Sequence, residues 1–142
     1  MNIKDDNPQS AFSLIADFEG DMEALMHTPH DSVLPALPLR YMMLFPGVVG
    51  SISVGRESSM KVVNGALKNG SLIAVFTQKD ASVDEPEGKD LYPLGVLARV
   101  MRTIDLPNGH TAAILQSYGP LLLESLKRRK PYYRAEVTSL EE

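Results

Sequence analysis

Apolar and polar residues alternate along several stretches between residues 34 and 140, and this pattern predicts a domain built mainly of β-strands. Residues 71–78 (SLIAVFTQ) are almost continuously apolar and have the length of a buried strand. Residues 48–55 predict an irregular strand or an extended loop, and residues 132–140 predict a final strand. In residues 91–106, apolar side chains share one face of a long strand, with Arg102 as the exception. They are Val96, Ala98, Val100, Ile104 and Leu106.

A hairpin turn is predicted at Asn108-Gly109, because a type I′ turn needs positive φ at both of its central residues. A two-residue loop pairs Ile104 with Ala113 and turns Ala113 and Leu115 toward the same inner face. After this hairpin, the stretch that follows Pro120 and ends in a basic run predicts a short helix.

One helix is predicted between residues 56 and 70. Its apolar residues recur at helical spacing: Met60, Val63 and Leu67. Ser58 or Ser59 is expected to cap its first turn, and Gly70 to end it. Gly65 lowers the helix propensity, so either close packing requires it or tertiary contacts hold the helix. Together these patterns predict five or six strands and one helix, in a curled and mostly antiparallel sheet.

The stretch LPLRYMMLFPG, residues 37–47, is too short for a membrane span and too apolar for an ordinary loop. Pro38 and Pro46 confine a strand to about residues 39–44. We expect Leu39, Met43 or one of its neighbours, and Phe45 to pack this strand into the core.

Charge divides the chain into two parts. Residues 1–33 hold one lysine and seven acids, a net charge of −6, whereas residues 34–142 carry +2. We therefore expect an acidic, flexible leader at 1–33 and a folded domain at 34–142. The chain has no cysteine, no signal-peptide pattern and no transmembrane-length apolar run, which favours a cytoplasmic location and no membrane partner. The nearly neutral body also makes nucleic acid an unlikely partner.

Groups that perform chemistry are scarce in this sequence. GALKNGS has two glycines at phosphate-loop spacing, but Ser71 stands where the loop's lysine belongs. His27 and His30 lack a suitable third metal ligand nearby. No nucleophile and base pair can be assembled, and the basic run at 127–130 is typical of a solvated surface. We predict no catalytic, cofactor-binding or metal-binding residues, and a binding module rather than an enzyme.

Several short motifs occur in a characteristic order. They are PLR at 38–40, FPG at 45–47, VGR at 54–56 with Ser59, QKD at 78–80 with Pro86, DLY at 90–92 with Gly95, and LPNG at 106–109. In this order the chain resembles the N-terminal substrate-recognition domain of the ATP-dependent Lon protease family, over about residues 34–140. It departs from that family where Gly50 replaces a usual proline, and where Gln116 and Ser117 replace Glu and Gly.

The resemblance implies a PUA-like, six-stranded pseudo-barrel with one packed helix. It also implies binding of unfolded, damaged or signal-bearing proteins for degradation by ATPase and peptidase modules elsewhere in a longer chain. That full-length parent would be an ATP-dependent serine endopeptidase. The resemblance is also compatible with assembly of the full-length parent as a homo-oligomer. Two alternatives remain: a stand-alone Lon-like adaptor or scaffold, and a PUA-like RNA-binding module.

Two sets of site residues follow from this resemblance. We expect client proteins to be held by exposed apolar side chains, and the candidates are Tyr41, Met42, Tyr92 and Tyr118. Arg40 lies in the most apolar part of the domain and needs an anionic partner there. We predict that it forms a structural ion pair with Asp90, the acid that opens the DLY motif.

Overall fold

The structure, a computed structural model, describes residues 22–128 and 131–140. Its elements follow one another as α2 (Met22–Met26), β1 (Val33–Leu39), β2 (Val49–Val54), α3 (Glu57–Asn69), β3 (Leu72–Thr77), the short 3₁₀ helix η2 (Gly88–Asp90), β4 (Leu94–Asp105), β5 (Thr111–Arg128) and β6 (Tyr133–Ser139). The basic run at 127–130 lies partly outside the described residues.

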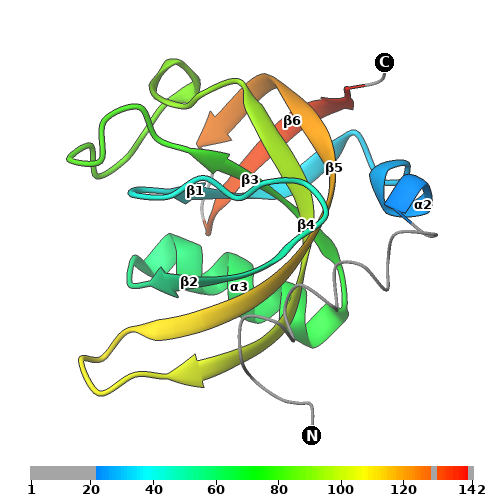
Figure 1. Cartoon of the computed structure of the whole chain (residues 1–142). Helices are drawn as coiled ribbons and strands as arrows, with labels where there is room; N and C mark the ends of the chain where they lie inside the picture. Colours follow the sequence, from blue (N-terminus) through cyan, green and yellow to red (C-terminus); the bar gives the residue numbers. More distant parts are fainter. Residues whose placement is uncertain (1–21, 129–130, 141–142) are drawn as a thin grey trace, which may run out of the picture.

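The described strands form one six-stranded sheet that closes on itself (Figure 1). Their order is β2-β5-β4-β3-β1-β6, and β6 pairs a second time with β5. Within the described residues, β1 and β3 run parallel and the other strand pairs are antiparallel. The predicted mainly-β fold, with six mostly antiparallel strands and one packed helix, is therefore confirmed.

Strand β1 begins six residues earlier than the proline positions suggested, so the predicted strand at residues 39–44 was wrong. The first half of β1 pairs with β6 and the second half pairs with β3. Each half therefore has one open edge in this sheet, which lets the strand hold Pro35 and Pro38, whose nitrogens donate no hydrogen bond. Residues 40–48 form a loop between β1 and β2, hereafter the β1–β2 loop.

Strand β5 replaces the helix predicted after Pro120. Its first part pairs with β2 as far as Gln116, and its last part pairs with β6 from Leu121 onward. Gly119 and Pro120 lie between these two partners, where a missing donor is tolerated. Tertiary pairing along 18 residues thus overrides the local helical pattern.

The β4–β5 hairpin turns at the predicted place but in a different register. Ile104 pairs with Ala112, one residue away from the predicted Ala113, and β4 has an irregularity between Val100 and Arg102. Val96, Ala98 and Val100 are buried as expected, whereas Ile104 is exposed. The irregularity shifts the alternation by one residue, and for this reason the end of β4 points its apolar residues outward.

Helix α3 packs across one side of the sheet and contacts β1, β3 and β4. Its buried residues, Val62, Val63 and Ala66, join a core cluster that includes Leu37, Leu39 and Ile52. A second core cluster contains Phe76, Leu97 and Leu121. The helix ends as predicted at Gly70, where φ is 65°, but no serine caps its start; Arg56 occupies that position without a side-chain cap.

The end of the predicted leader packs on the barrel, while residues 1–21 lie outside the described residues. Helix α2 contacts β5, and a Cβ placed on Gly119 would lie 2.1 Å from the Met26 carbonyl oxygen. The carbonyl oxygen of Ser32 accepts a hydrogen bond from the Val137 N–H, and Val33 begins β1. The segment from α2 to β1 is thus part of the folded unit. No helix of the described chain has the length and apolar character needed to cross a membrane.

Candidate functional site

An open cavity of about 470 Å³ lies where the end of β1, the end of β2, the start of α3 and the base of the β4–β5 hairpin meet. Leu37, Leu39, Ile52 and Val54 supply much of its apolar wall. The rest of the lining comes from Pro38, Arg40, Tyr41, Met42, Ser53, Gly55, Arg56, Ser59 and His110. This volume falls in the roughly 300–1,000 Å³ range of small-ligand pockets. We call it the apolar cavity.

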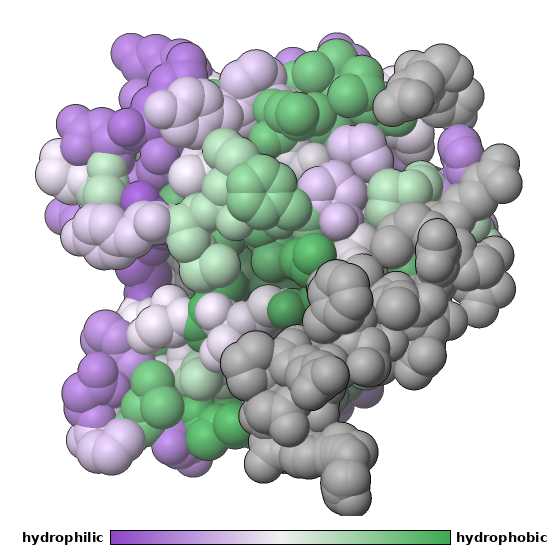
Figure 2. Space-filling view, viewed as in Figure 1, coloured by the Kyte–Doolittle hydropathy of each residue, from purple (hydrophilic) through white to green (hydrophobic). Residues whose placement is uncertain are grey.

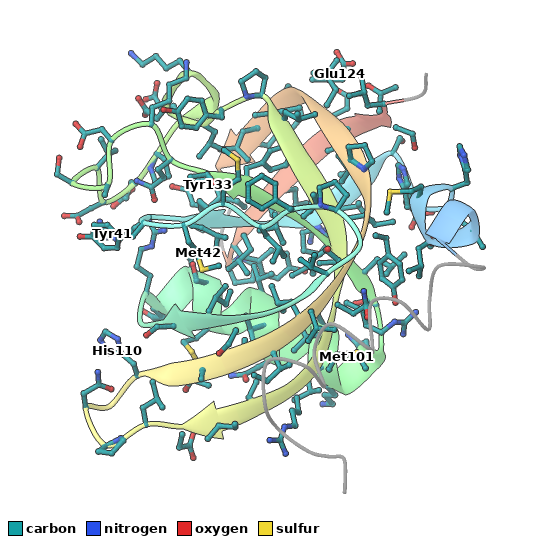
Figure 3. All side chains as sticks on the ribbon, viewed as in Figure 1. Tyr41, Met42, Met101, His110, Glu124 and Tyr133 are labelled. Carbon is teal, nitrogen blue, oxygen red and sulfur yellow. The ribbon has the colours of Figure 1, made fainter. Side chains whose placement is uncertain are left out.

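The β1–β2 loop carries exposed apolar side chains beside this cavity. Tyr41 has a relative exposure of 86% and Phe45 of 62%, and Met42 and Met43 are also exposed. Figure 3 shows Tyr41 projecting away from the loop and Met42 turned beneath it, with His110 across the gap. Phe45 was predicted to be a core residue, and this prediction was wrong, because the chain leaves the sheet after Leu39. Met43 is exposed, and its neighbour Leu44 takes the core position instead.

Leu44 of the β1–β2 loop is buried in the core, and Val48 at the end of the loop packs against the same core cluster. The loop is also fastened to β5 by Ser117, which is fully buried. The Ser117 hydroxyl donates to the Phe45 carbonyl and accepts from the Val48 N–H at 2.9 Å. Gln116 Nε2 lies 3.4 Å from the Val48 carbonyl. The two residues that depart from the family motif therefore hold the loop that presents the apolar side chains.

Tyr92 is linked to the β1–β2 loop through Thr77. The Thr77 hydroxyl donates to the Met42 carbonyl, and the Thr77 carbonyl accepts from the Tyr92 N–H, each at 2.9 Å. Tyr92 is 44% exposed. We call Tyr41, Met42, Met43, Phe45 and Tyr92 the apolar surface. Figure 2 shows hydrophobic side chains gathered in the middle of this face and again at the top, over β4 and β5.

The structure does not place Tyr118 with the other three candidates. It is partly buried on β5, packs against the second core cluster and does not line the apolar cavity. Its hydroxyl accepts from Arg99 Nε at 3.3 Å, and Arg99 also donates to the Gly70 carbonyl at the end of α3. In these contacts Tyr118 packs within the fold and is not part of the apolar surface.

Arg40 pairs with Asp84, so the predicted partner Asp90 was wrong. Arg40 Nη2 lies 3.2 Å from Asp84 Oδ1, and Arg40 Nη1 donates to the Ala81 carbonyl. Asp90 instead accepts from the Glu87 N–H in the capping box of η2. Because Asp84 is 88% exposed, the ion pair itself contributes only about 0–1 kcal/mol.

Arg56 ties the same acidic loop, residues 79–90, to β1. It donates to the Asp84 carbonyl at 3.2 Å and to the Pro38 carbonyl at 2.8 Å. Burial, together with the positive charge of Arg40, holds the pKa of the Arg56 guanidinium below its usual range. Gln78, which directly precedes the loop, donates from its Nε2 to the carbonyls of Asp80 and Val83 within it. The PLR, VGR and QKD motifs thus converge on one network that orders this loop.

Three residues at the cavity were not singled out as site residues from the sequence: Arg56, Ser59 and His110. Arg56 belongs to the VGR motif, and this membership could have identified it as a site residue from the sequence. Ser59 was considered as a cap, but it is buried with no hydrogen-bond partner for its hydroxyl among the described residues. His110 reaches the cavity because the hairpin folds back over β2, which local sequence does not encode. Within the described chain, no three His, Asp or Glu residues gather as a metal site.

A closed β-barrel with one helix, which presents apolar side chains beside an open cavity, defines a small binding domain. Residues 33–142 match the family described as the ATP-dependent protease La (LON) substrate-binding domain. The chain belongs to this family.

Similar proteins agree with this assignment. The chain is 39% identical over 109 residues to a Lon protease of Parabacteroides distasonis, covering 77% of this chain and 13% of the relative. It is 34% identical over 138 residues to a Lon protease of Porphyromonas gingivalis, covering 96% of this chain and 16% of the relative. The chain therefore spans only a small fraction of the length of these relatives.

Two solved structures share the fold. The crystal structure of a Lon N-terminal domain protein from Xanthomonas campestris superposes with a TM-score of 0.60 at 19% identity, covering 78% of this chain and 61% of the other. The N-terminal domain of Mycobacterium avium complex Lon protease gives a TM-score of 0.61 at 16% identity, covering 78% and 55%. At these identities the likeness concerns the fold alone.

Proposed function

We propose that this chain recognises unfolded or damaged proteins for an ATP-dependent Lon-type serine protease, in the cytoplasm, and contributes no catalytic group of its own. The family assignment supports the substrate-binding role. ATP hydrolysis and peptide cleavage would belong to other modules of a longer chain, of which the present residues span 13–16% in the relatives named above.

The apolar surface is the observation that carries this proposal. Unfolded proteins differ from folded ones mainly in the apolar side chains that they expose, and an exposed apolar patch on a folded domain marks an interaction site. Tyr41 and Met42 meet the solvent at the rim of the apolar cavity, and Tyr92 extends the surface beyond them. Methionine adapts to side chains of different shapes, which suits a binder that accepts many sequences.

Binding of a permanently unfolded protein tests this function. Reduced and carboxymethylated α-lactalbumin, labelled with a fluorophore, should bind the chain, whereas the native protein should not. The variant Tyr41→Ser, Met42→Ser, Tyr92→Ser should lose at least about tenfold in affinity, because it removes three apolar contacts at once. Far-UV circular dichroism would establish that this variant is folded.

Met101→Ser with Ile104→Ser is the matched control, because these two side chains are exposed on β4 and do not line the apolar cavity. This control should bind the unfolded protein as the wild type does. Equal affinity for native and unfolded lactalbumin would contradict the proposed function. A triple variant that retains full affinity would contradict the assignment of the site. Addition of the isolated chain should also slow degradation of the same unfolded protein by a full-length Lon-type protease, through competition for the client.

A further inference from the structure

A second hollow, of about 600 Å³, adjoins the apolar cavity. Arg40 and Arg56 line both spaces, so these two residues form the wall between them. Behind this wall the second hollow is bounded by Asp84, Tyr132 and Tyr133. An extended chain that fills the apolar cavity with one side chain would thus carry its next residues past two arginines.

We propose that the apolar cavity and this arginine pair form one site for an extended peptide segment in which a large apolar residue is followed closely by a carboxylate. The inference rests on the proposed function, whose client class it narrows. The site would accept a client's aspartate or glutamate side chain at the arginines.

The apolar end of the site contains a buried hydroxyl without a described partner. Ser59 is 5% exposed, lines the apolar cavity, and has no hydrogen-bond partner for its Oγ among the described residues. Buried polar groups are normally paired, since leaving one unpaired costs its full desolvation. A bound peptide carries both a donor and an acceptor at each non-proline residue, and it would pair with this hydroxyl once the Ser59 side chain turns toward the cavity.

The charged end of the site has donor capacity to spare. A guanidinium has five N–H donors, and each of these arginines makes two of the hydrogen bonds described above. Arg56 donates to two backbone carbonyls, so its charge meets no carboxylate through these bonds. Arginine binds a carboxylate best when two parallel N–H groups face its two oxygens. The described contact between Arg40 and Asp84 uses one nitrogen and one oxygen.

Asp84 acts in this scheme as an internal carboxylate that a client can displace. Its side chain is 88% exposed, so the ion pair with Arg40 is weak and its exchange costs little. The other charged pair at this hollow, Lys61 with Glu57, is 3.6 Å apart on α3 and is already matched. Glu85 also lines the hollow, so the gain from a client carboxylate comes from geometry at the two arginines rather than from a large net positive charge.

Fluorescence anisotropy with three labelled peptides tests the proposal. In a Gly-Ser background they carry a central Phe-Asp, Phe-Asn or Ser-Asp step. Phe-Asp should bind about tenfold more tightly than Phe-Asn, the ratio given by one charge-assisted hydrogen bond. This ratio should shrink as salt is added. Ser-Asp should bind more weakly than Phe-Asp, because nothing fills the apolar cavity.

The variant Asp84→Asn distinguishes this site from general apolar binding. Loss of the internal competitor should tighten Phe-Asp binding severalfold and leave Phe-Asn binding unchanged. Asp105→Asn, which removes an exposed carboxylate from the hairpin, is the matched control and should change neither. Ser59→Ala should weaken both peptides to the same extent.

Equal affinity for Phe-Asp and Phe-Asn, or an Asp84→Asn variant that binds Phe-Asp no better than wild type, would overturn the proposal and leave the proposed function intact. Binding of unfolded lactalbumin without binding of any of the three peptides would do the same. Failure of both the peptides and the unfolded lactalbumin to bind would overturn the proposed function itself.

Discussion

The substitution Ser117→Ala removes the hydroxyl that fastens the β1–β2 loop to β5. Two backbone groups then lose a partner: the Phe45 carbonyl and the Val48 N–H. A fully buried orphan group costs about 1–3 kcal/mol, but both of these bonds are only partly buried, so water compensates in part. We therefore expect the free energy of unfolding to fall by about 1–2 kcal/mol in total.

For a domain of this size, that loss lowers the Tm by about 4–8 °C. Urea denaturation at constant protein concentration gives the free energy directly, provided that the m-value is unchanged. Ser51→Ala is the control, because Ser51 is exposed on β2 and its substitution should change stability by less than about 0.5 kcal/mol. Ser117→Ala should also weaken binding of unfolded lactalbumin, since the loop presents Tyr41 and Phe45.

A Ser117→Ala variant as stable as Ser51→Ala would show that the loop does not depend on this hydroxyl. A variant that is destabilised but binds the unfolded protein normally would show that the loop conformation is irrelevant to client binding. The first result would refute the link between the Ser117 hydroxyl and loop stability, and the second would refute the link between loop conformation and client binding.

Gly65→Ala should stabilise the protein by about 0.5–1 kcal/mol, because a Cβ at Gly65 meets nothing within 4 Å and alanine favours the helix; a fall in Tm would refute this. Gly95→Ala should destabilise by about 1–3 kcal/mol or more, because its Cβ would lie 2.3 Å from the Val75 carbonyl oxygen, and an unchanged urea midpoint would contradict that packing. Deletion of residues 1–32 should lower the Tm below that of a chain lacking residues 1–21, because it removes α2 and the Ser32 carbonyl; equal Tm values for the two deletions would show that α2 adds no stability.

Local pattern was sufficient for elements whose environment is uniform along their length. β3 is buried at its four central residues, and its continuous apolar run predicted a buried strand. α3 shows helical spacing of its apolar residues and ends at a glycine with positive φ. β6 buries Tyr133, Ala135 and Val137 in strict alternation. In each case one periodicity applies from end to end, so the sequence pattern and the structure agree.

Prediction failed where the environment changes within one element. β1 changes its pairing partner from β6 to β3 at its middle. This change leaves open edges that accommodate the two prolines, and no local sequence signal predicts it. β5 likewise passes from β2 to β6 around Pro120.

Tyr41, Met42 and Tyr92 are exposed, and their assignment to client binding stays a prediction. The partner of Arg40 depended on how the acidic loop folds back. Asp90 opens the DLY motif and Asp84 lies within the acidic loop, so sequence context favoured the wrong acid and only the tertiary structure identifies Asp84.

Chemical-shift mapping of the isotopically labelled chain, titrated with reduced and carboxymethylated α-lactalbumin, tests the proposed client site most directly. The largest shifts should fall on the β1–β2 loop, Tyr92 and His110, which border the apolar surface and the apolar cavity. Shifts centred on Tyr118 and Arg99, or no shifts at a concentration that saturates binding by anisotropy, would contradict the proposal that this surface holds unfolded proteins.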